Sequence, residues 1–162
     1  MAVPTSSDPM GGKLSVTINN VTIPSFLIGS VSPSVKQVLR TSDRLSGSTT
    51  SPSNQLDNPS FEVVFYPNKW ADLQYFMPDS MNDDNTALIL GGSDCSIPAA
   101  VPVVLHYECE DDEDRDVSMP SVRVSFEDNK ERNAADDLSV TIHIYPQPNA
   151  MGQIIYGPMP TS

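Results

Sequence analysis

Proline restricts the fold of this chain more than any other residue type. The sequence contains 15 prolines in 162 residues, nearly twice the frequency of roughly 5% that is typical of proteins. Each proline removes a backbone N–H donor and clashes with the preceding helical turn, so long helices have little room. A helical bundle is therefore excluded, and the length indicates one domain.

Alternation of apolar and polar residues indicates short β-strands along most of the chain. The clearest are residues 121–126 and 138–145, in which every second side chain is apolar. Further strands are expected at residues 14–18, 21–28, 34–40, 61–66, 86–90, 101–109 and 153–156. This series predicts a mainly β fold of two packed antiparallel sheets, as a sandwich or a flattened barrel.

One short flanking helix interrupts the strand pattern. Residues 69–77 lie between two prolines and repeat apolar side chains every three to four residues, at Trp70, Leu73 and Met77. This spacing predicts a helix that packs one apolar stripe against a sheet. Its aromatic side chains are expected in the core rather than around a ligand.

A polar stretch at residues 41–60 breaks the strand pattern. It consists almost entirely of Ser, Thr, Asn, Asp, Gly and Pro around two leucines. A structureless loop of about 20 residues is uncommon in a small domain and is usually functional or disordered. Two interpretations are open, a flexible surface loop or an arm that becomes ordered against a neighbouring subunit. The candidate assembly residues are Thr41, Arg44, Leu45, Leu56 and Asn58.

The ends of the chain differ in composition from the body. Residues 1–12 are rich in Pro, Ser and Gly and are expected to form an extended N-terminal arm. Residues 13–157 form the predicted β domain, and residues 158–162 a C-terminal tail. The N-terminus lacks a basic start followed by an apolar run, so no signal peptide is expected. The longest nearly apolar stretch, residues 97–105, is about half a membrane span, so no membrane insertion is expected.

The charge of the chain is strongly negative and unevenly distributed. The net charge is −12 at pH 7, and nearly all of it lies in residues 81–162. Attraction to nucleic-acid phosphates or to an anionic membrane surface requires clustered Lys and Arg. We therefore expect this chain to be repelled by both.

Residues 108–116 form the most acidic segment, and three interpretations of it are open. A solvated loop is the default for a block of like charges. Calcium binding is a weaker candidate, through Asp112, Asp114 and Asp116. The EF-hand pattern fails because, counting from Asp112, position six is valine and position twelve is arginine. The third interpretation is a negative surface that keeps a polyanion from sticking. Its carboxylates are Glu108, Glu110, Asp111, Asp112, Glu113, Asp114 and Asp116.

The sequence does not support an enzyme. The two histidines, His106 and His143, fall in predicted strands, and no serine has a nucleophile-elbow context. No glycine-rich loop opens a helix, and no His/Cys/Asp cluster has metal-ligand spacing. Cys95 and Cys109 fit no metal or redox spacing, which favours free thiols over a disulfide. We expect no catalytic residue, no cofactor and no dedicated metal site.

The order of the segments carries a family resemblance over about residues 13–157. After an arm and a hairpin come IGSVSPS at residues 28–34, the polar stretch, FEVVF at residues 61–65, WADL at residues 70–73, MPSVRVSF at residues 119–126 and the strand at residues 138–145. This order resembles the major tail tube proteins of tailed bacteriophages, a fold family shared with the tubes of contractile injection systems.

The resemblance implies a structural protein of the virion tail, made in the host bacterial cytoplasm. Six copies would form a ring in which inner sheets join edge to edge, and stacked rings would form a tube. The helix would lie outside, while the long loop and the termini would reach other subunits. A negatively lined lumen would let DNA pass without specific binding. Further partners would be the tape-measure, terminator and baseplate proteins.

Physical arguments agree with self-assembly, and two alternatives are kept open. Exposed sheet edges make a monomer prone to aggregation. Pairing these edges between copies in a ring uses the same interaction for ordered assembly. The first alternative is a monomeric β-sandwich binding or adhesion module, stabilised by calcium through the acidic segment. The second is a tail-completion or connector protein that forms a single ring and no filament.

Overall fold

The computed structural model describes residues 14–93, 97–107 and 113–159. Its strands are β1 (Leu14–Ile18), β2 (Val21–Ile23), β3 (Ile28–Ser34), β4 (Gln37–Arg44), β5 (Gly47–Leu56), β6 (Ser60–Phe65), β7 (Val101–Tyr107), β8 (Val117–Glu127), β9 (Val140–Pro146) and β10 (Ile155–Tyr156). Three short 3-10 helices complete the described elements, namely η1 (Ser25–Leu27), η2 (Trp70–Tyr75) and η3 (Pro78–Ser80). In this part of the chain no helix has the length and apolarity that a membrane crossing requires.

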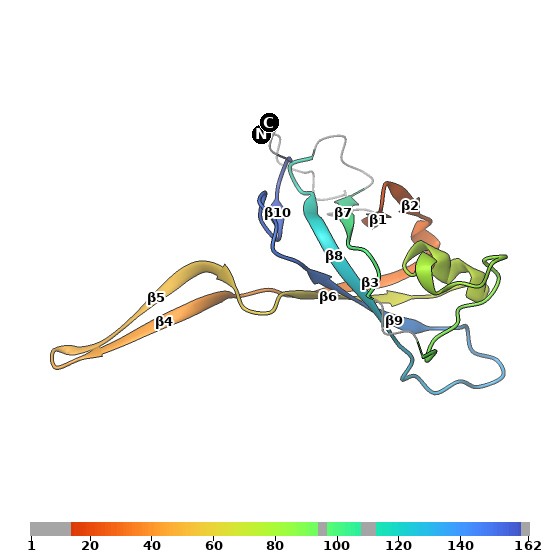
Figure 1. Cartoon of the computed structure of the whole chain (residues 1–162), viewed down its shortest axis with the longest axis horizontal. Helices are drawn as coiled ribbons and strands as arrows, with labels where there is room; N and C mark the ends of the chain where they lie inside the picture. Colours follow the sequence, from red (N-terminus) through yellow and green to blue (C-terminus); the bar gives the residue numbers. More distant parts are fainter. Residues whose placement is uncertain (1–13, 94–96, 108–112, 160–162) are drawn as a thin grey trace, which may run out of the picture.

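The strands form one large antiparallel sheet and one small one (Figure 1). The large sheet has the order β2-β1-β7-β8-β9-β6-β3, and β10 pairs with β8 outside this path. Its end strands, β2 and β3, do not pair with each other, so the sheet is not a closed barrel. The small sheet is the β4–β5 hairpin, which projects away from the large sheet instead of covering it (Figure 1). The predicted mainly β fold with two antiparallel sheets and little helix is confirmed, but the two sheets do not pack face to face as a sandwich or flattened barrel, because the small sheet projects away from the large one.

The prediction of a structureless loop at residues 41–60 is wrong, because most of this stretch lies in the projecting hairpin. Arg44 pairs with Gly47 across a two-residue turn, and Thr41 pairs with Thr50 further down the ladder. Gly47 has a φ of +128°, a conformation that glycine adopts without steric cost. Almost every side chain of β4 and β5 is exposed, so neither strand has a buried face.

The hydrophobic core lies on one face of the large sheet. On β6 the buried side chains are Phe61, Val63 and Phe65, as the alternation predicted. The other strands add Val16, Ile18, Ile23, Val103, Leu105, Met119, Val122, Val140, Ile142 and Ile144. Leu73 of η2 and Phe76 pack on the same face, and the rings of Phe65 and Phe76 meet edge to face at 5.1 Å.

The predicted helix exists but is shorter and tighter than expected. It spans Trp70–Tyr75 in 3-10 geometry, between Pro67 and Pro78. A segment this short between two prolines lacks the length that stabilises an α-helix, whereas one or two 3-10 turns are common. The carboxylate of Asp72 accepts the backbone N–H of Asn68 at 2.9 Å, which closes the first turn.

Several predicted strands differ from the observed ones, and the strand expected at residues 34–40 is divided between the end of β3 and the start of β4. The strand expected at residues 21–28 is broken at Pro24, where η1 separates β2 from β3. The strand expected at residues 86–90 is wrong. There a single bridge joins Met81 to Leu88, because the side chain of Asn82 accepts two backbone N–H groups and folds this segment into a polar loop.

Candidate assembly surfaces

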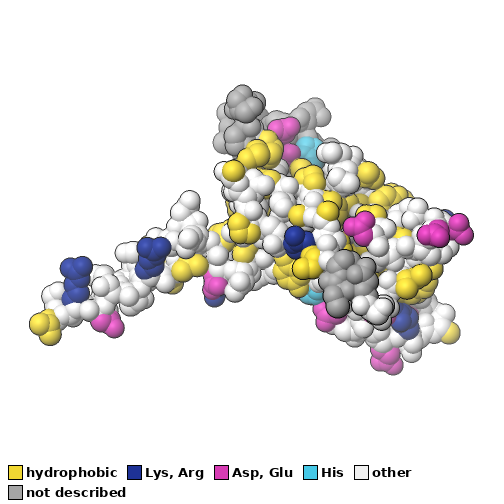
Figure 2. Space-filling model, viewed as in Figure 1, with side chains coloured by type: hydrophobic (Ala, Val, Ile, Leu, Met, Phe, Trp, Pro, Cys, Tyr) yellow, Lys and Arg dark blue, Asp and Glu magenta, His cyan; other side chains and the backbone are white. Residues whose placement is uncertain are grey.

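The projecting hairpin carries three of the five predicted assembly residues between the middle of β4 and the turn. Thr41 lies midway along β4, Arg44 precedes the turn, and Leu45 is fully exposed in the turn. Leu56 and Asn58 lie instead at the base, where β5 ends and the chain passes to β6. Figure 2 shows basic side chains along the hairpin and a hydrophobic group at its tip.

The base of the hairpin is held by few interactions. The N–H of Asp57 donates to the carbonyl of Lys36 at 2.9 Å, and the two side chains form an ion pair at 3.6 Å. Both side chains are largely exposed, so this pair adds little stability. The hairpin itself carries two arginines, Arg40 and Arg44, and one aspartate, Asp43. It is therefore the basic element of a strongly acidic chain.

A polar face lies opposite the core of the large sheet. Alternation along β6, β9 and β8 directs Glu62, His143, Tyr145, Ser125 and Glu127 to this side. The rings of His143 and Tyr145 stack at 6.2 Å. The sequence predicted His143 and Tyr145 on the polar side of their strand, and the structure places them there.

Only part of the acidic segment can be placed. Glu108, Glu110, Asp111, Asp112, Cys95 and Cys109 lie outside the described residues. Glu113 and Asp114 are exposed, as expected for a solvated loop.

Asp116 differs from the exposed part of the acidic segment. It is only 8% exposed, and its Oδ1 lies 2.5 Å from Nδ1 of His106. This partly buried pair, on β7 and just before β8, had no sequence signal. Partial burial raises the pKa of the phenol of the nearby Tyr156.

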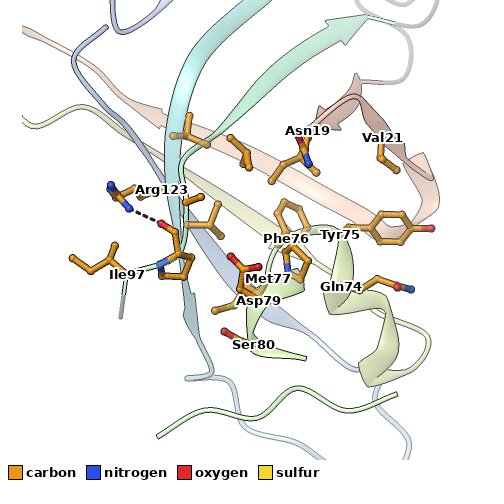
Figure 3. Close-up of a pocket in the computed structure, with 17 residues that line it drawn as sticks. Asn19, Val21, Gln74, Tyr75, Phe76, Met77, Asp79, Ser80, Ile97 and Arg123 are labelled. Carbon is orange, nitrogen blue, oxygen red and sulfur yellow. Dashed lines mark hydrogen bonds between the residues drawn. The ribbon is translucent and has the colours of Figure 1, made fainter. Parts of the chain in front are cut away.

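An apolar groove of about 500 Å³ lies between the η2–η3 segment and strands β1, β7 and β8 (Figure 3). Phe76, Met77 and Val122 contribute to its lining, with Asp79 and Arg123 among its polar groups. The guanidinium of Arg123 donates to the carbonyl of Pro98 at 2.5 Å. The groove is built from four separate stretches of sequence, so no local pattern could have predicted it.

The chain shares its fold with chains of contractile injection systems. No family model and no curated protein matches its sequence. Among solved structures, it is similar to a chain of the PVC sheath–tube complex of an extracellular contractile injection system in the extended state. The identity is 11%, the TM-score is 0.55, and 93% of this chain and 91% of that chain are covered.

Two further solved structures show the same likeness. The anti-feeding prophage cap, which terminates a tube, matches with 10% identity and a TM-score of 0.57, covering 90% of this chain and 89% of the other. A chain of the PVC sheath/tube terminator in the extended state matches with 11% identity and a TM-score of 0.53, covering 96% of each. These likenesses support the predicted tail-tube-like fold, and at 10–11% identity they concern the fold alone.

Proposed function

We propose that this chain is a structural tail protein whose copies form hexameric rings that stack into a tube for DNA delivery. The observation that carries the proposal is the projecting β4–β5 hairpin in a fold shared with tube, terminator and cap structures. In this role the chain needs no catalytic residue and no cofactor. Its location is the virion tail, after synthesis in the bacterial cytoplasm.

The hairpin supports contact between copies because it has almost no support within its own chain. A two-stranded hairpin is marginally stable by itself in water. Beyond its base, the described structure gives β4 and β5 few contacts other than those with each other. Leu39 and Leu45 are exposed along it. Docking on a neighbouring copy would bury these leucines, and the gain in hydrophobic burial would offset the entropy lost in ordering the arm.

The open ends of the large sheet support ring formation. The outer edges of β2 and β3 carry no neighbouring strand in the described structure. Strand pairing between copies through such edges removes them from water and closes a ring. The core face is covered by η2, so the polar face with Glu62 and Glu127 is the side we assign to the lumen. A lumen of this charge repels DNA phosphates and lets DNA pass.

Further partners follow from the same role. Residues 1–12 and 158–162 are proposed to make contacts with adjacent copies, and the acidic residues from Glu108 to Asp116 to contribute to the negative surface. Tape-measure, terminator and baseplate proteins are the expected partners at the ends and interior of the tube. No specific DNA contact is proposed, because the described part of the large sheet offers no cluster of basic side chains.

Electron microscopy of the purified protein in negative stain, with light scattering across a concentration series, tests the proposal. We expect hollow tubes or stacked rings with a central pore. A variant in which Asn-Gly replaces residues 40–51 should lose stacking. Its urea unfolding should match that of the wild type, since the hairpin contributes nothing to the core. A wild type that stays monomeric at every concentration and gains thermal stability with calcium would overturn the proposal in favour of the binding module.

A second candidate is a terminator or connector ring, favoured by the likeness to the cap and terminator structures. Such a protein would form one ring and no filament. The same images separate the two roles, because single rings at the highest concentration exclude a stacking protein. In that case the hairpin variant should leave the ring intact and lose binding to the end of a tube.

A further inference from the structure

Three side chains of types that bind metal ions converge on the polar face of the large sheet. They are Glu62 of β6, Glu127 of β8 and His143 of β9, and their ligand atoms all lie within 4.8 Å of one another. Among the described residues, the surroundings of Asp114 and Asp116 form no comparable group. The three ligands come from three different strands, so the sequence offered no spacing that could reveal them.

The strand register explains why these side chains meet. Glu62 pairs directly with His143 across β6 and β9. Glu127 pairs with Thr141, which places it diagonally from His143 on the neighbouring strand β8. Side chains at direct and diagonal positions on one face of a sheet are within reach of each other. Because β9 is hydrogen-bonded on both sides, the backbone holds the three positions rigidly.

In the described part of the chain, no lysine or arginine balances the charges of this group. Within the described residues, neither Glu62 nor Glu127 forms an ion pair with a basic side chain other than the imidazole. The nearest arginine along β8, Arg123, donates instead to the carbonyl of Pro98. Two carboxylates so close together repel each other, and a bound cation removes this repulsion.

The hydrogen bond within the group shows how His143 is oriented. Its Nε2 lies 2.5 Å from Oε2 of Glu127, so an Nε2–H group donates to the carboxylate. The side chains are 23% and 44% exposed, which leaves the group open to ions from solvent. A metal ion bound at Nε2 requires the ring proton to be on Nδ1, and Glu127 then changes from hydrogen-bond acceptor to metal ligand.

We propose that Glu62, Glu127 and His143 bind one divalent transition-metal ion, for which zinc is the probe. One imidazole nitrogen and two carboxylate oxygens suit zinc, with water in the fourth position. Calcium prefers six to eight oxygen ligands and fits poorly. At zinc–ligand distances of about 2.1 Å, tetrahedral ligand atoms lie roughly 3.4 Å apart. Rotation of the two exposed glutamate side chains would bring the ligand atoms to this spacing, which is wider than the 2.5 Å between His143 and Glu127 and lies within the 4.8 Å that contains the whole group.

Isothermal titration with zinc chloride tests the site, and the test is independent of assembly because one chain supplies all three ligands. We expect one saturable equivalent. Glu62→Gln and His143→Asn should each weaken zinc affinity at least about tenfold, the smallest loss usual even for groups outside the ligand set. Cobalt provides a second readout, since tetrahedral cobalt bound to the protein absorbs visible light more strongly than the hydrated ion, and this absorption should be lost when His143→Asn prevents binding.

His106→Asn is the matched control. His106 and Asp116 form a pair with the same 2.5 Å separation but belong to no group of three metal-binding side chains among the described residues, so this variant should bind zinc as the wild type does. The titration is repeated in a Cys95→Ser/Cys109→Ser variant, because thiolates also bind zinc. Zinc binding that survives both Glu62→Gln and His143→Asn, or that depends on the cysteines, would place the ion elsewhere and overturn the proposal.

Discussion

Ile144 and Leu45 occupy the two extremes of burial in this chain. Ile144 is fully buried on β9, whereas Leu45 is fully exposed at the hairpin tip. Ile144→Ala leaves a cavity and is expected to cost about 2–5 kcal/mol of unfolding free energy. Leu45→Ala removes no internal contact and should stay within about 0.5 kcal/mol of the wild type.

Urea unfolding of the two variants measures this difference directly. Leu45→Ala should nevertheless weaken self-association, seen as a higher threshold concentration in light scattering. A Leu45→Ala variant that assembles as the wild type does would show that the tip leucine is not buried between copies. Equal stability losses in the two variants would contradict the observed burial.

Burial at the residue scale was predictable where strands alternate strictly. Phe61, Val63 and Phe65 occur at every second position of β6, and each lies in the core. The grouping of the candidate metal ligands, in contrast, depends on strand pairing and not on local alternation. Glu62 is separated from Glu127 by more than sixty residues of sequence, and only the pairing of β6, β9 and β8 brings them together. A single sequence carries no record of that pairing.

At the scale of elements, the β4–β5 hairpin is the main feature that the sequence did not predict as regular structure. Strand prediction depends on an apolar face, and these strands have none. Their threonines favour extended backbone, but serine and glycine dilute that preference. The position of the 3-10 helix η2 was predictable, because prolines mark its two ends. Its 3-10 geometry was not, because those prolines do not specify the helical pitch.

Hydrogen exchange should distinguish the hairpin from the large sheet. In the unassembled protein, amides of β9 should exchange only through global unfolding, since β9 is paired on both sides and its core side chains are buried. Amides of β4 and β5 should exchange much faster, because their ladder is exposed on both faces. Protection of the hairpin is expected to rise on assembly.

Mass spectrometry of deuterated peptides covers both elements in one experiment. Peptides from residues 37–56 report the hairpin, and peptides from residues 140–146 report β9. Hairpin protection equal to that of β9 before assembly would show that the arm is stabilised within its own chain. Protection that does not change on assembly would remove the hairpin from the contact between copies.

At the scale of the whole molecule, charge should set the conditions for assembly. Each copy carries a net charge of −12, so copies repel one another at low ionic strength. Raising salt from about 0.01 M to about 0.15 M shortens the Debye length from about 30 Å to about 8 Å. Light scattering should therefore show assembly at lower protein concentration as salt rises.

The opposite salt response would identify a different driving force. Assembly that weakens with salt would mean that attraction between the arginines of the hairpin and the acidic remainder of a neighbouring copy outweighs the overall repulsion. Arg40→Gln and Arg44→Gln would then abolish the salt dependence. Either outcome is read from the same titration, with the shortened-hairpin variant as a non-assembling reference.

The fold class was predictable from proline content and alternation, but the arrangement of the strands was not. A series of short amphipathic strands suits two facing sheets as well as one large sheet. Here Leu73 and Phe76 cover the core where a second sheet would otherwise lie. Strand order depends on pairs distant in sequence, such as β6 with β9, which local patterns do not encode.

The hairpin also has a mechanical consequence. β4 is eight residues long, so the arm reaches about 26 Å from its base at roughly 3.3 Å per residue. A tilt of about 5° at the base moves the tip by about 2 Å, which is comparable to a side-chain adjustment, while the body stays undistorted. In the proposed tube, an arm of this kind would act as a flexible connection between rigid subunits. A column of such bodies would bend by many small tilts and return to straight without breaking a single internal strand pair.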